Sequence, residues 1–178
     1  MKVCCISAKA RHGKDTAAAM IAEYLEEKGN KVLITHFADL LKYICKQFFG
    51  WNGEKDVKGR TLLQYVGTDV VGAQKPGYWA NFLADFLKMF EKEWDFVIIP
   101  DCRYPIELET MEENFETILL RVERPGFDNG LTDEQKKHPS ETAMDKGEAY
   151  YDAILYNDSD LETLQDKVEW FADNFLIN

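Results

Sequence analysis

The sequence predicts an α/β domain with a mostly parallel sheet, and three observations lead to this fold class. Segments with the pattern of strands and segments with the pattern of helices alternate along the 178 residues. The first strand leads through a loop containing Gly13 directly into an amphipathic helix. The hydrophobic fraction of 46% is enough for a buried core, and the length suits a single domain spanning 1–178.

Five short apolar segments predict the strands. Each has the length of a strand and ends at polar or turn-forming residues, as expected for strands buried in a parallel sheet. The clearest is the run from Phe96 to Pro100, which a charged segment follows directly. The predicted strands are 2–7, 31–35, 96–100, 117–122 and 153–156.

Apolar residues at helical spacing predict the helices between these strands. The first helix is expected at 14–28, where Gly29 ends it. Three further helical patterns lie within 40–90, and a closing helix with a solvated acidic face is expected at 161–175. The last of the three patterns carries an aromatic stripe that its period assigns to the core: Trp79, Phe82, Phe86 and Phe90.

The polar stretch 125–138 has no apolar periodicity and contains the turn-forming pair Asn129-Gly130. We expect it to form a loop that stays mobile until an anionic ligand arrives, because it has too little apolar content to pack tightly. Loops of this length inside a domain are usually functional.

Charge and composition exclude several function classes. Asp and Glu number 32 against 21 Lys and Arg, a net charge of −11, whereas non-specific binding to nucleic acid needs a basic surface. The apolar runs are far shorter than the ~20 residues of a spanning helix, and the N-terminal segment lacks the apolar region of a signal peptide. The four cysteines show no C-x-x-C spacing. We expect a cytoplasmic protein with reduced thiols and small-molecule partners.

The loop after the first strand carries the clearest chemical signal. It ends in Gly13-Lys14-Asp15-Thr16 and opens a helix, which is the context of a phosphate-binding loop of pattern G-x-x-x-x-G-K-[ST]. Backbone N–H groups and the helix N-terminus attract phosphate, and Lys14 supplies a positive charge. Ala8 replaces the first glycine, and Asp15 replaces the hydroxyl residue that Thr16 supplies one place later. An ordinary capped helix start is the alternative.

A second signal follows the strand 96–100, where the chain reads Asp101-Cys102-Arg103. The carboxyl end of a buried parallel strand is where such sheets place ligand and metal groups. An acidic residue there holds Mg²⁺ in phosphate-transferring enzymes with this type of loop. The alternative is that Asp101 caps the next helix, which would begin near Pro105.

These motifs resemble those of the deoxynucleoside monophosphate kinases, a branch of the P-loop nucleoside monophosphate kinases. The resemblance spans nearly the whole chain and rests on several motifs in order. Besides the loop ending in Gly-Lys-Asp-Thr, they are Phe37-Ala38-Asp39-Leu40-Leu41-Lys42, a segment from Arg60 to Asp69 similar to Arg-x-Leu-Leu-Gln-x-x-Gly-Thr, Asp101-Cys102-Arg103-Tyr104-Pro105-Ile106-Glu107, Arg121-Val122-Glu123-Arg124-Pro125-Gly126 and His138-Pro139-Ser140-Glu141.

The resemblance implies a three-layer P-loop NTPase fold, with a five-stranded parallel sheet, flanking helices, a helical substrate-binding region at 38–92 and a lid-like region at 125–145. It also implies transfer of the γ-phosphate of ATP to a deoxynucleoside monophosphate in the presence of Mg²⁺. Such transfer needs positioning and charge neutralisation more than a strong base. No catalytic histidine is therefore expected, and the backbone of His12 is expected to matter more than its ring.

The resemblance places roles on matching residues. The catalytic group is Lys14, Arg103 and Arg124. The residues expected to bind ATP are Ala10, Arg11, His12, Gly13, Lys14, Asp15 and Thr16. The residues expected to bind the acceptor are Lys42, Arg60, Gln64, Trp79, Asp101 and Arg103, with core packing as the alternative for Trp79. Asp15 and Asp101 are expected to position Mg²⁺, and Lys136, Lys137 and His138 are expected to lie with Arg124 in the lid.

Other functions stay open from the sequence. A P-loop kinase with another phosphorylated acceptor, such as dephospho-coenzyme A, would carry the same loop. A nucleotide-binding switch or regulatory module would bind with little turnover, although the Asn-Lys-x-Asp signature of small GTPases is absent after Asn30-Lys31. Ala8 keeps open a degenerate paralogue that binds nucleotide without turnover. A monomer or a homodimer is expected.

Overall fold

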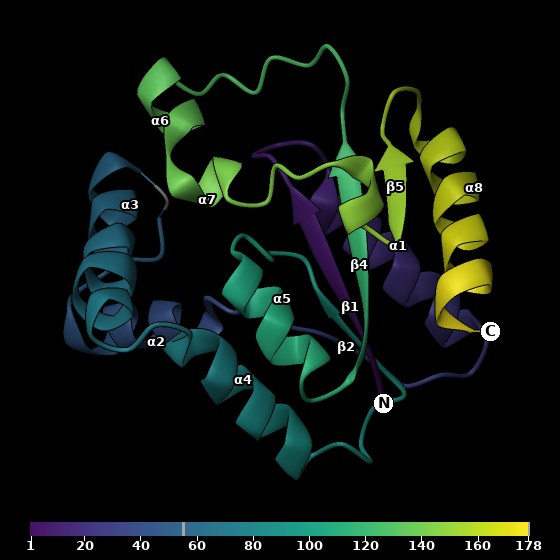
Figure 1. Cartoon of the computed structure of the whole chain (residues 1–178), viewed down its shortest axis with the longest axis horizontal. Helices are drawn as coiled ribbons and strands as arrows, with labels where there is room; N and C mark the ends of the chain where they lie inside the picture. The colour runs from purple at the N-terminus through teal and green to yellow at the C-terminus, as the bar shows by residue number, and fades with distance from the viewer. Residues whose placement is uncertain (55, 178) are drawn as a thin grey trace.

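The computed structural model describes residues 1–54 and 56–177 and forms one five-stranded parallel sheet. The strands are β1 (Lys2–Ala8), β2 (Val32–Ile34), β3 (Phe96–Ile99), β4 (Glu116–Glu123) and β5 (Ala153–Tyr156). Their order is β2-β3-β1-β4-β5, so the strand that opens the chain lies at the centre (Figure 1). The predicted fold class is confirmed, and each predicted strand coincides closely with an observed one.

Helices cover both faces of the sheet (Figure 1). The four that pack on it are α1 (Lys14–Glu27), α4 (Tyr78–Met89), α5 (Pro105–Glu112) and α8 (Leu161–Phe171). Successive side chains of a strand face opposite sides of the sheet, and β1 therefore contributes to two cores. Cys4 and Ile6 pack with α1 and α8, whereas Val3 and Cys5 pack with α4 and α5. The central strand is thus buried on both sides.

A helical region lies between β2 and β3 and has a small core of its own. Its elements before α4 are α2 (Asp39–Phe48), α3 (Val57–Gln64) and the π-helix η1 (Tyr65–Gly72). The Asp56 side chain caps α3 by accepting a 2.7 Å hydrogen bond from the amide of Gly59. Leu41, Cys45 and Val66 are buried together in the core of this region. The helices occupy the range expected at 38–92, and substrate binding there stays a prediction.

The π-helix η1 interrupts the pattern around 62–70 that the sequence analysis treats as one helical segment. Gly67 packs so closely on Leu41 that a Cβ atom at Gly67 would lie 2.6 Å from the Leu41 side chain. Its carbonyl oxygen accepts a 3.1 Å hydrogen bond from the indole nitrogen of Trp79. Trp79 therefore packs against this small core, which agrees with the core alternative for that residue.

The aromatic stripe of α4 is only partly buried, so its assignment to the core is wrong for two residues. Phe82 and Phe90 are each 43% exposed. The buried face of α4 is formed instead by Leu83 and Leu87 with two alanines, about 100° round the helix from the neighbouring aromatic residues. A period of 3.6 residues does not by itself say which of two adjacent positions faces the sheet.

The polar stretch 125–138 is predicted to be a loop, and that prediction is wrong for its second half. It contains α6 (Asp133–Lys137), and α7 (Pro139–Thr142) follows directly. Thr132 and Gln135 form a capping box at the start of α6: the Thr132 hydroxyl accepts from the Gln135 amide, and the Gln135 side chain accepts from the Thr132 amide. The Thr-x-x-Gln pattern that signals this helix start is visible in the sequence.

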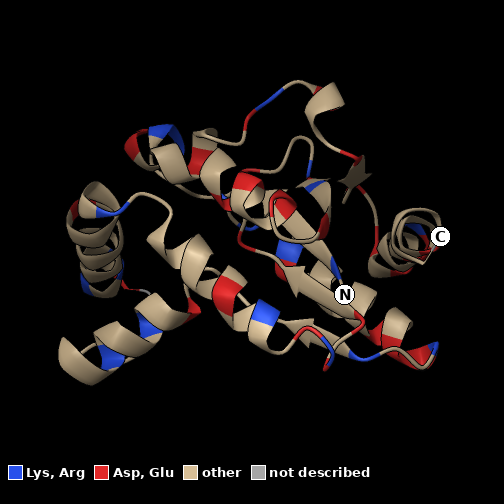
Figure 2. Cartoon of the chain, turned by 60° about the horizontal axis from the view of Figure 1, so that its bottom comes forward, with Lys and Arg blue, Asp and Glu red and all other residues tan. Residues whose placement is uncertain are grey.

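The structure also bears on the thiols, the surface charges and the possibility of a membrane span. All four cysteines are buried and free. Acidic and basic residues are interspersed over the outer helices in the view of Figure 2. Across residues 1–54 and 56–177, no helix has the length and apolarity needed to span a membrane.

We predict that the core between α1, α8 and β1 depends strongly on Phe171. This side chain is fully buried, so Phe171→Ala should lower the free energy of unfolding by about 3–5 kcal/mol. The neighbouring Trp170 is 58% exposed, and Trp170→Ala should cost about 1 kcal/mol or less. Urea unfolding of the two variants checks the difference, and equal losses would contradict the burial of Phe171.

Candidate active site

The loop between β1 and α1, here called the phosphate loop (residues 8–16), folds back on itself before the helix begins. The amide of His12 donates to the carbonyl of Lys9 at 3.2 Å, and Arg11 adopts a left-handed conformation with φ 64°. Gly13 has φ 99°, and a Cβ atom there would lie 2.5 Å from the side-chain nitrogen of Asn157. That nitrogen donates to the carbonyl of His12 at 3.1 Å. Glycine is therefore required at position 13 by both conformation and space.

The start of α1 provides the groups expected to hold a phosphate. The first-turn amides of an α-helix have no acceptor within the helix, and together they attract anions. The Nζ atom of Lys14 lies 2.5 Å from the carboxylate of Asp15, and the side chain of Lys14 is only 14% exposed. Thr16 is exposed on the same turn. Lys14 and Asp15 therefore form a contact pair at the predicted site of the outer phosphates.

Asp101 lies at the carboxyl end of β3, as predicted, but it does not cap α5. Its two oxygens accept hydrogen bonds from the backbone amides of Phe37, at 2.9 Å, and Ala38, at 3.3 Å. These residues follow β2, so Asp101 ties together the ends of two neighbouring strands. The cap residue of α5 is Tyr104, with Pro105 as the first residue of the helix. The capping alternative is wrong because a longer connection separates the strand from the helix.

A chain of polar contacts leads from the phosphate loop to α2. The Nε2 atom of His36 lies 4.0 Å from Asp15, and its Nδ1 atom lies 3.2 Å from Asp39. Asp39 accepts from the Nζ atom of Lys42 at 2.8 Å. Partial burial raises the pKa of Asp39, but the hydrogen bond and charge of Lys42 outweigh it and hold that pKa below its usual value. Lys42, which is predicted to bind the acceptor nucleotide, is therefore paired with the ionised carboxylate of Asp39.

Glu107 supports the backbone around Arg103 from the first turn of α5. One of its oxygens accepts from the amides of Arg103, at 2.7 Å, and Tyr104, at 3.1 Å. Burial, together with the negative charge of Asp101, raises the pKa of Glu107 to about 8, although the two amides and the Arg103 charge act in the opposite direction. Glu107 is thus largely neutral at pH 7.

The Arg103 side chain is held by a residue that the sequence analysis gives no role. Its Nη1 atom donates to the Oε1 atom of Glu141 at 2.9 Å and to the carbonyl of Ser140 at 3.1 Å. The other oxygen of Glu141 accepts from the amide of Ala10 at 2.9 Å. The signal for Glu141 in the sequence is its place in the His138-Pro139-Ser140-Glu141 motif, which carries no indication of its contacts.

The segment from Arg124 through the lid (residues 125–145) docks on the phosphate loop. Besides the Glu141 contact, Lys9 lies 2.9 Å from Asp145, and the guanidinium of Arg11 donates to the carbonyl of Asn129 at 2.8 Å. The ring of His12 also contacts this segment, at the amide of Arg124. Four consecutive loop residues, 9–12, therefore bond to it. The lid is docked on the phosphate loop in this structure, and its mobility before a ligand binds stays a prediction.

The ring of His12 has a structural role that the sequence analysis misses. Its Nδ1 atom accepts a 3.0 Å hydrogen bond from the amide of Arg124, the residue before the lid. Burial and the charge of Arg121 lower the pKa of His12, which favours the neutral ring that can accept this bond. The guanidinium of Arg124 lies 4.1 Å from the ring centre of Phe127. His12 and Phe127 thus position Arg124 beside the phosphate loop.

Arg121 fixes the far end of the lid to β4. Its side chain is 4% exposed and contacts the Ser7 hydroxyl at 3.0 Å, Glu123 at 3.3 Å and Asp145 at 3.0 Å. A buried guanidinium is stable only when it is paired in this way. Met144, beside Asp145, is 3% exposed and packs in the core under α4 and α5.

Apart from Lys42 and Trp79, the predicted site residues fall into three groups. Those of the phosphate loop, with Asp101, Arg103 and Arg124, lie at the carboxyl edge of the sheet around α7 (Figure 1). Arg60 and Gln64 are exposed on α3, which lies to one side of the sheet (Figure 1). The lid residues Lys136 and Lys137 are exposed on α6, and His138 caps α7 by accepting from the Ser140 amide.

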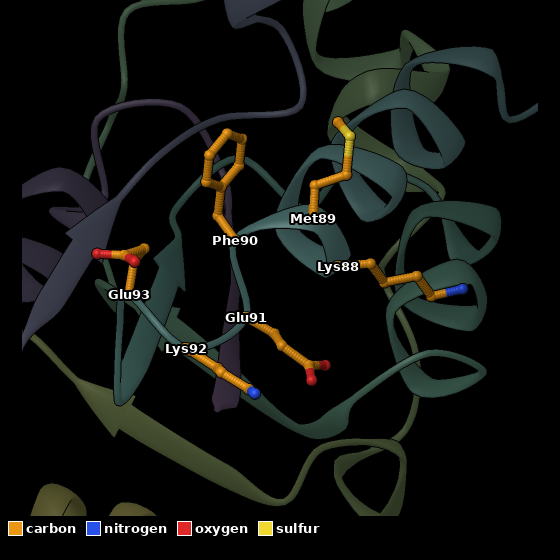
Figure 3. A pocket seen from close by; sticks show the side chains of 6 residues that line it. All are labelled: Lys88, Met89, Phe90, Glu91, Lys92 and Glu93. Carbon is orange, nitrogen blue, oxygen red and sulfur yellow. The ribbon is translucent and has the colours of Figure 1, made fainter.

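Two hollows lie on the surface, and the second of them adjoins this arrangement, because His36 and Asp39 are among its lining residues. One follows α4 and is lined by the side chains of a single segment, Lys88 to Glu93, several of which point into solvent (Figure 3). The other is an apolar groove of about 290 Å³ between α2 and α4, lined by Tyr43, Phe82 and Phe86 among others.

Comparison with known proteins gives matches of two kinds. The family model for deoxynucleotide monophosphate kinase matches residues 25–168. The deoxynucleotide monophosphate kinase of Enterobacteria phage T4 is 30% identical over 112 residues, which cover 62% of this chain and 43% of that protein. The chain thus spans less than half the length of this relative. The phosphate loop precedes the matched range of the family model, so its assignment rests on the motif and geometry described above.

Solved structures show the same fold at low identity. The APS kinase of Mycobacterium tuberculosis in complex with AMPPNP and APS has a TM-score of 0.53 and 10% identity, covering 97% of this chain and 95% of that one. A sugar kinase from Janibacter sp. has a TM-score of 0.57 and 13% identity, with coverages of 97% and 94%. At such identities the likeness establishes the fold alone.

We predict that Glu107 makes stability depend on pH. Its pKa is raised in the folded chain to about 8 from an ordinary value of 4.5, so the folded state binds the proton more tightly than the unfolded state does. The free energy of unfolding should therefore fall as pH rises from about 4.5 to about 8. Glu107→Gln keeps an accepting oxygen and removes the ionisation, and should flatten this decline.

Glu109→Gln is the matched control, because Glu109 is exposed on the same helix. Urea unfolding at several pH values compares the two variants with the wild type. Equal pH slopes for the wild type and Glu107→Gln would contradict a raised pKa for Glu107.

Proposed function

Because the chain belongs to the deoxynucleotide monophosphate kinase family, we propose that it transfers the γ-phosphate of ATP to a deoxynucleoside monophosphate. The observation that carries the proposal is the phosphate loop, in which Gly13 and Lys14 open a helix at the carboxyl end of the central strand. Asp101 and Arg103 follow the neighbouring strand β3. This is a site that can position and neutralise phosphates, which is what phosphoryl transfer requires.

The donor side of the site is the phosphate loop. The amides at the start of α1 would hold the inner phosphates of ATP, and Lys14 would neutralise charge on its outer phosphates. Lys14 would exchange Asp15 for a phosphate oxygen on binding. The close contact of Gly13 with Asn157 supports the donor role, because contacts within the protein hold the loop in shape.

The acceptor side would lie between Arg103 and the helical region after β2. Arg103 would contact the acceptor phosphate, and Lys42, Arg60 and Gln64 are further candidates from α2 and α3. An oxygen of the acceptor phosphate would form the new bond to the γ-phosphorus while the bond to the bridging oxygen of ADP breaks. The attacking oxygen is already anionic, so no base has to remove a proton.

Asp15 and Asp101 would hold a magnesium ion in the proposed reaction. Mg²⁺ is usually held by one or two carboxylates together with waters and substrate phosphates, and Asp15 and Asp101 supply that number. In the described part of the chain, no group of three or more His, Cys, Asp or Glu residues is placed to hold a metal. When bound with the nucleotide, Mg²⁺ would neutralise charge on the transferring oxygens.

The lid would exclude water from the transferring phosphate. Its contacts with Lys9, Ala10 and Arg11 place it beside the donor site, and Arg124 would add a positive charge near the phosphates. Excluding water favours transfer to the acceptor over hydrolysis of ATP.

We also propose small nucleotides as the partners, and a cytoplasmic location in keeping with four buried, free thiols.

An acceptor panel tests the proposed function. ADP release is followed by a coupled assay with ATP, Mg²⁺ and each common deoxy- or ribonucleoside monophosphate, with dephospho-coenzyme A as a competing acceptor. The proposal expects ADP release that depends on a deoxynucleoside monophosphate. ADP release that is equal without any acceptor would favour a nucleotide-binding module with slow hydrolysis, and release only with dephospho-coenzyme A would favour a different kinase.

We predict that Lys14→Ala abolishes most of this activity and leaves the fold intact. Lys14 contacts Asp15 rather than the core, so its loss removes a charge aimed at the phosphates. Losing such a preorganised contact typically costs about 10²-fold or more in kcat. Steady-state kinetics and thermal melting check this expectation.

The matched control is Lys28→Ala, which removes the same charge after the far end of α1. It should leave kcat within about twofold, because exposed charges far from a site contribute little. Near-normal turnover of Lys14→Ala would show that the loop is not a donor site.

A further inference from the structure

Glu141 is a buried carboxylate that joins three parts of the candidate active site. Its side chain is 9% exposed, in the short helix α7 of the lid. Each of its oxygens has a partner: Oε1 accepts from Arg103 and Oε2 accepts from the amide of Ala10. A buried carboxylate without such partners would be strongly destabilising. The lid, the phosphate loop and Arg103 are therefore bonded through one side chain.

Glu141 contacts the first half of the phosphate loop, before the start of α1. The amide it binds belongs to Ala10, four residues before Lys14 and outside the first turn of α1. The helix amides that would hold phosphates lie beyond it along the chain. The Glu141 contact therefore leaves the first-turn amides of α1 open to a phosphate, while it occupies the amide of Ala10.

Arg103 is fixed at both ends by contacts within the protein. Its backbone amide donates to Glu107, and its Nη1 atom donates to Glu141 and to the Ser140 carbonyl. Its side chain remains 32% exposed. A guanidinium carries five N–H donors, so donors on Nε and Nη2 remain for an anion. Holding a long side chain in place beforehand reduces the entropy lost when it binds a phosphate.

From these contacts we infer that Glu141 is a positioning residue for Arg103 in the proposed phosphoryl transfer, and that it locks the lid to the phosphate loop. The inference rests on the proposed function and adds a residue to it. Glu141 itself touches no phosphate. It acts by orienting Arg103 toward the acceptor phosphate and by holding Ala10 at the edge of the loop.

The variant Glu141→Gln separates this role from simple packing. Glutamine has nearly the same volume, but it has one accepting oxygen and one donating nitrogen. The Ala10 amide and the Arg103 guanidinium both donate hydrogen bonds to Glu141. In the glutamine variant one of these two bonds is lost, because the side-chain NH₂ group is a donor and cannot accept it. The lid stays attached through Arg121 and Asp145, and Met144 stays in the core, so the variant is expected to fold.

The control is Glu134→Gln, which makes the same chemical change at an exposed position of α6 in the same lid. Kinetics with ATP and the best acceptor are measured for both variants, and Glu141→Gln is also combined with Arg103→Ala. We expect Glu141→Gln to lower kcat/KM for the acceptor by about tenfold or more, with KM for ATP changed by less than about threefold. Glu134→Gln should match the wild type.

The double variant decides whether Glu141 acts through Arg103. If it does, adding Glu141→Gln to Arg103→Ala should lower activity by less than about twofold further, because residues that act as a unit are not additive. Multiplicative losses would overturn the inference. A lower melting temperature with unchanged kinetics per folded molecule would also overturn it and leave Glu141 a structural residue.

A readout without turnover separates this inference from the proposed function. In ¹H–¹⁵N spectra of the ligand-free protein, Glu141→Gln should move the Ala10 amide and the Arg103 side-chain signals, while Glu134→Gln should not. If these signals do not respond, the inference fails whatever the activity. If they respond and the wild type transfers phosphate to no acceptor, the proposed function fails and the positioning of Arg103 by Glu141 stands.

Discussion

The docking of the segment after β4 on residues 9–12 is the constraint on which the geometry of the site depends. Four consecutive residues bond outward to that segment, through side chains at Lys9, Arg11 and His12 and through the amide of Ala10. Their contacts hold the first half of the phosphate loop, and Asn157 holds it from the side of β5. The second half, from Gly13 onward, opens α1 and stays available for phosphate. One loop is therefore both a docking surface and the proposed phosphate-binding site.

Pairing of charges explains how a chain with a net charge of −11 can offer an anion site. Cations at the carboxyl edge of the sheet have acidic partners: Lys14 contacts Asp15, Lys42 contacts Asp39 and Arg103 contacts Glu141. Two of these pairs can open in the proposed reaction, because ATP with its metal would take Lys14 and Asp15, and the acceptor would take Lys42. The Arg103 pair differs, since its carboxylate is buried and also bonded to the phosphate loop. The two lysines at this edge can therefore exchange their carboxylate partners for ligand groups, whereas Arg103 keeps Glu141.

Most of the fold could be predicted from the sequence because buried strands and amphipathic helices leave strong periodic signals. Strand positions, the parallel sheet and the Gly13-Lys14 loop are of this kind. The errors come from features without such a signal. The exposure of Phe82 depends on the rotation of α4 by one position, and the short helix α6 is marked by a capping box rather than by apolar spacing.

The candidate site shows the same division between local and long-range information. The roles predicted for Lys14, Asp101 and Arg103 follow from their positions just after strands, and the local sequence is enough to place those strands. The roles of the His12 ring and of Glu141 do not, because their partners lie 112 and 131 residues away along the chain. Contacts of that separation arise only when the sheet brings the end of β1 beside the end of β4.

In the proposed reaction the γ-phosphate passes directly from ATP to an acceptor phosphate at this site. A single-turnover experiment with γ-labelled ATP, excess protein, Mg²⁺ and a deoxynucleoside monophosphate tests it most directly. The label should appear in the deoxynucleoside diphosphate at a rate far above its release as free phosphate. Label found only as inorganic phosphate, at a rate that the acceptor does not change, would contradict the claim.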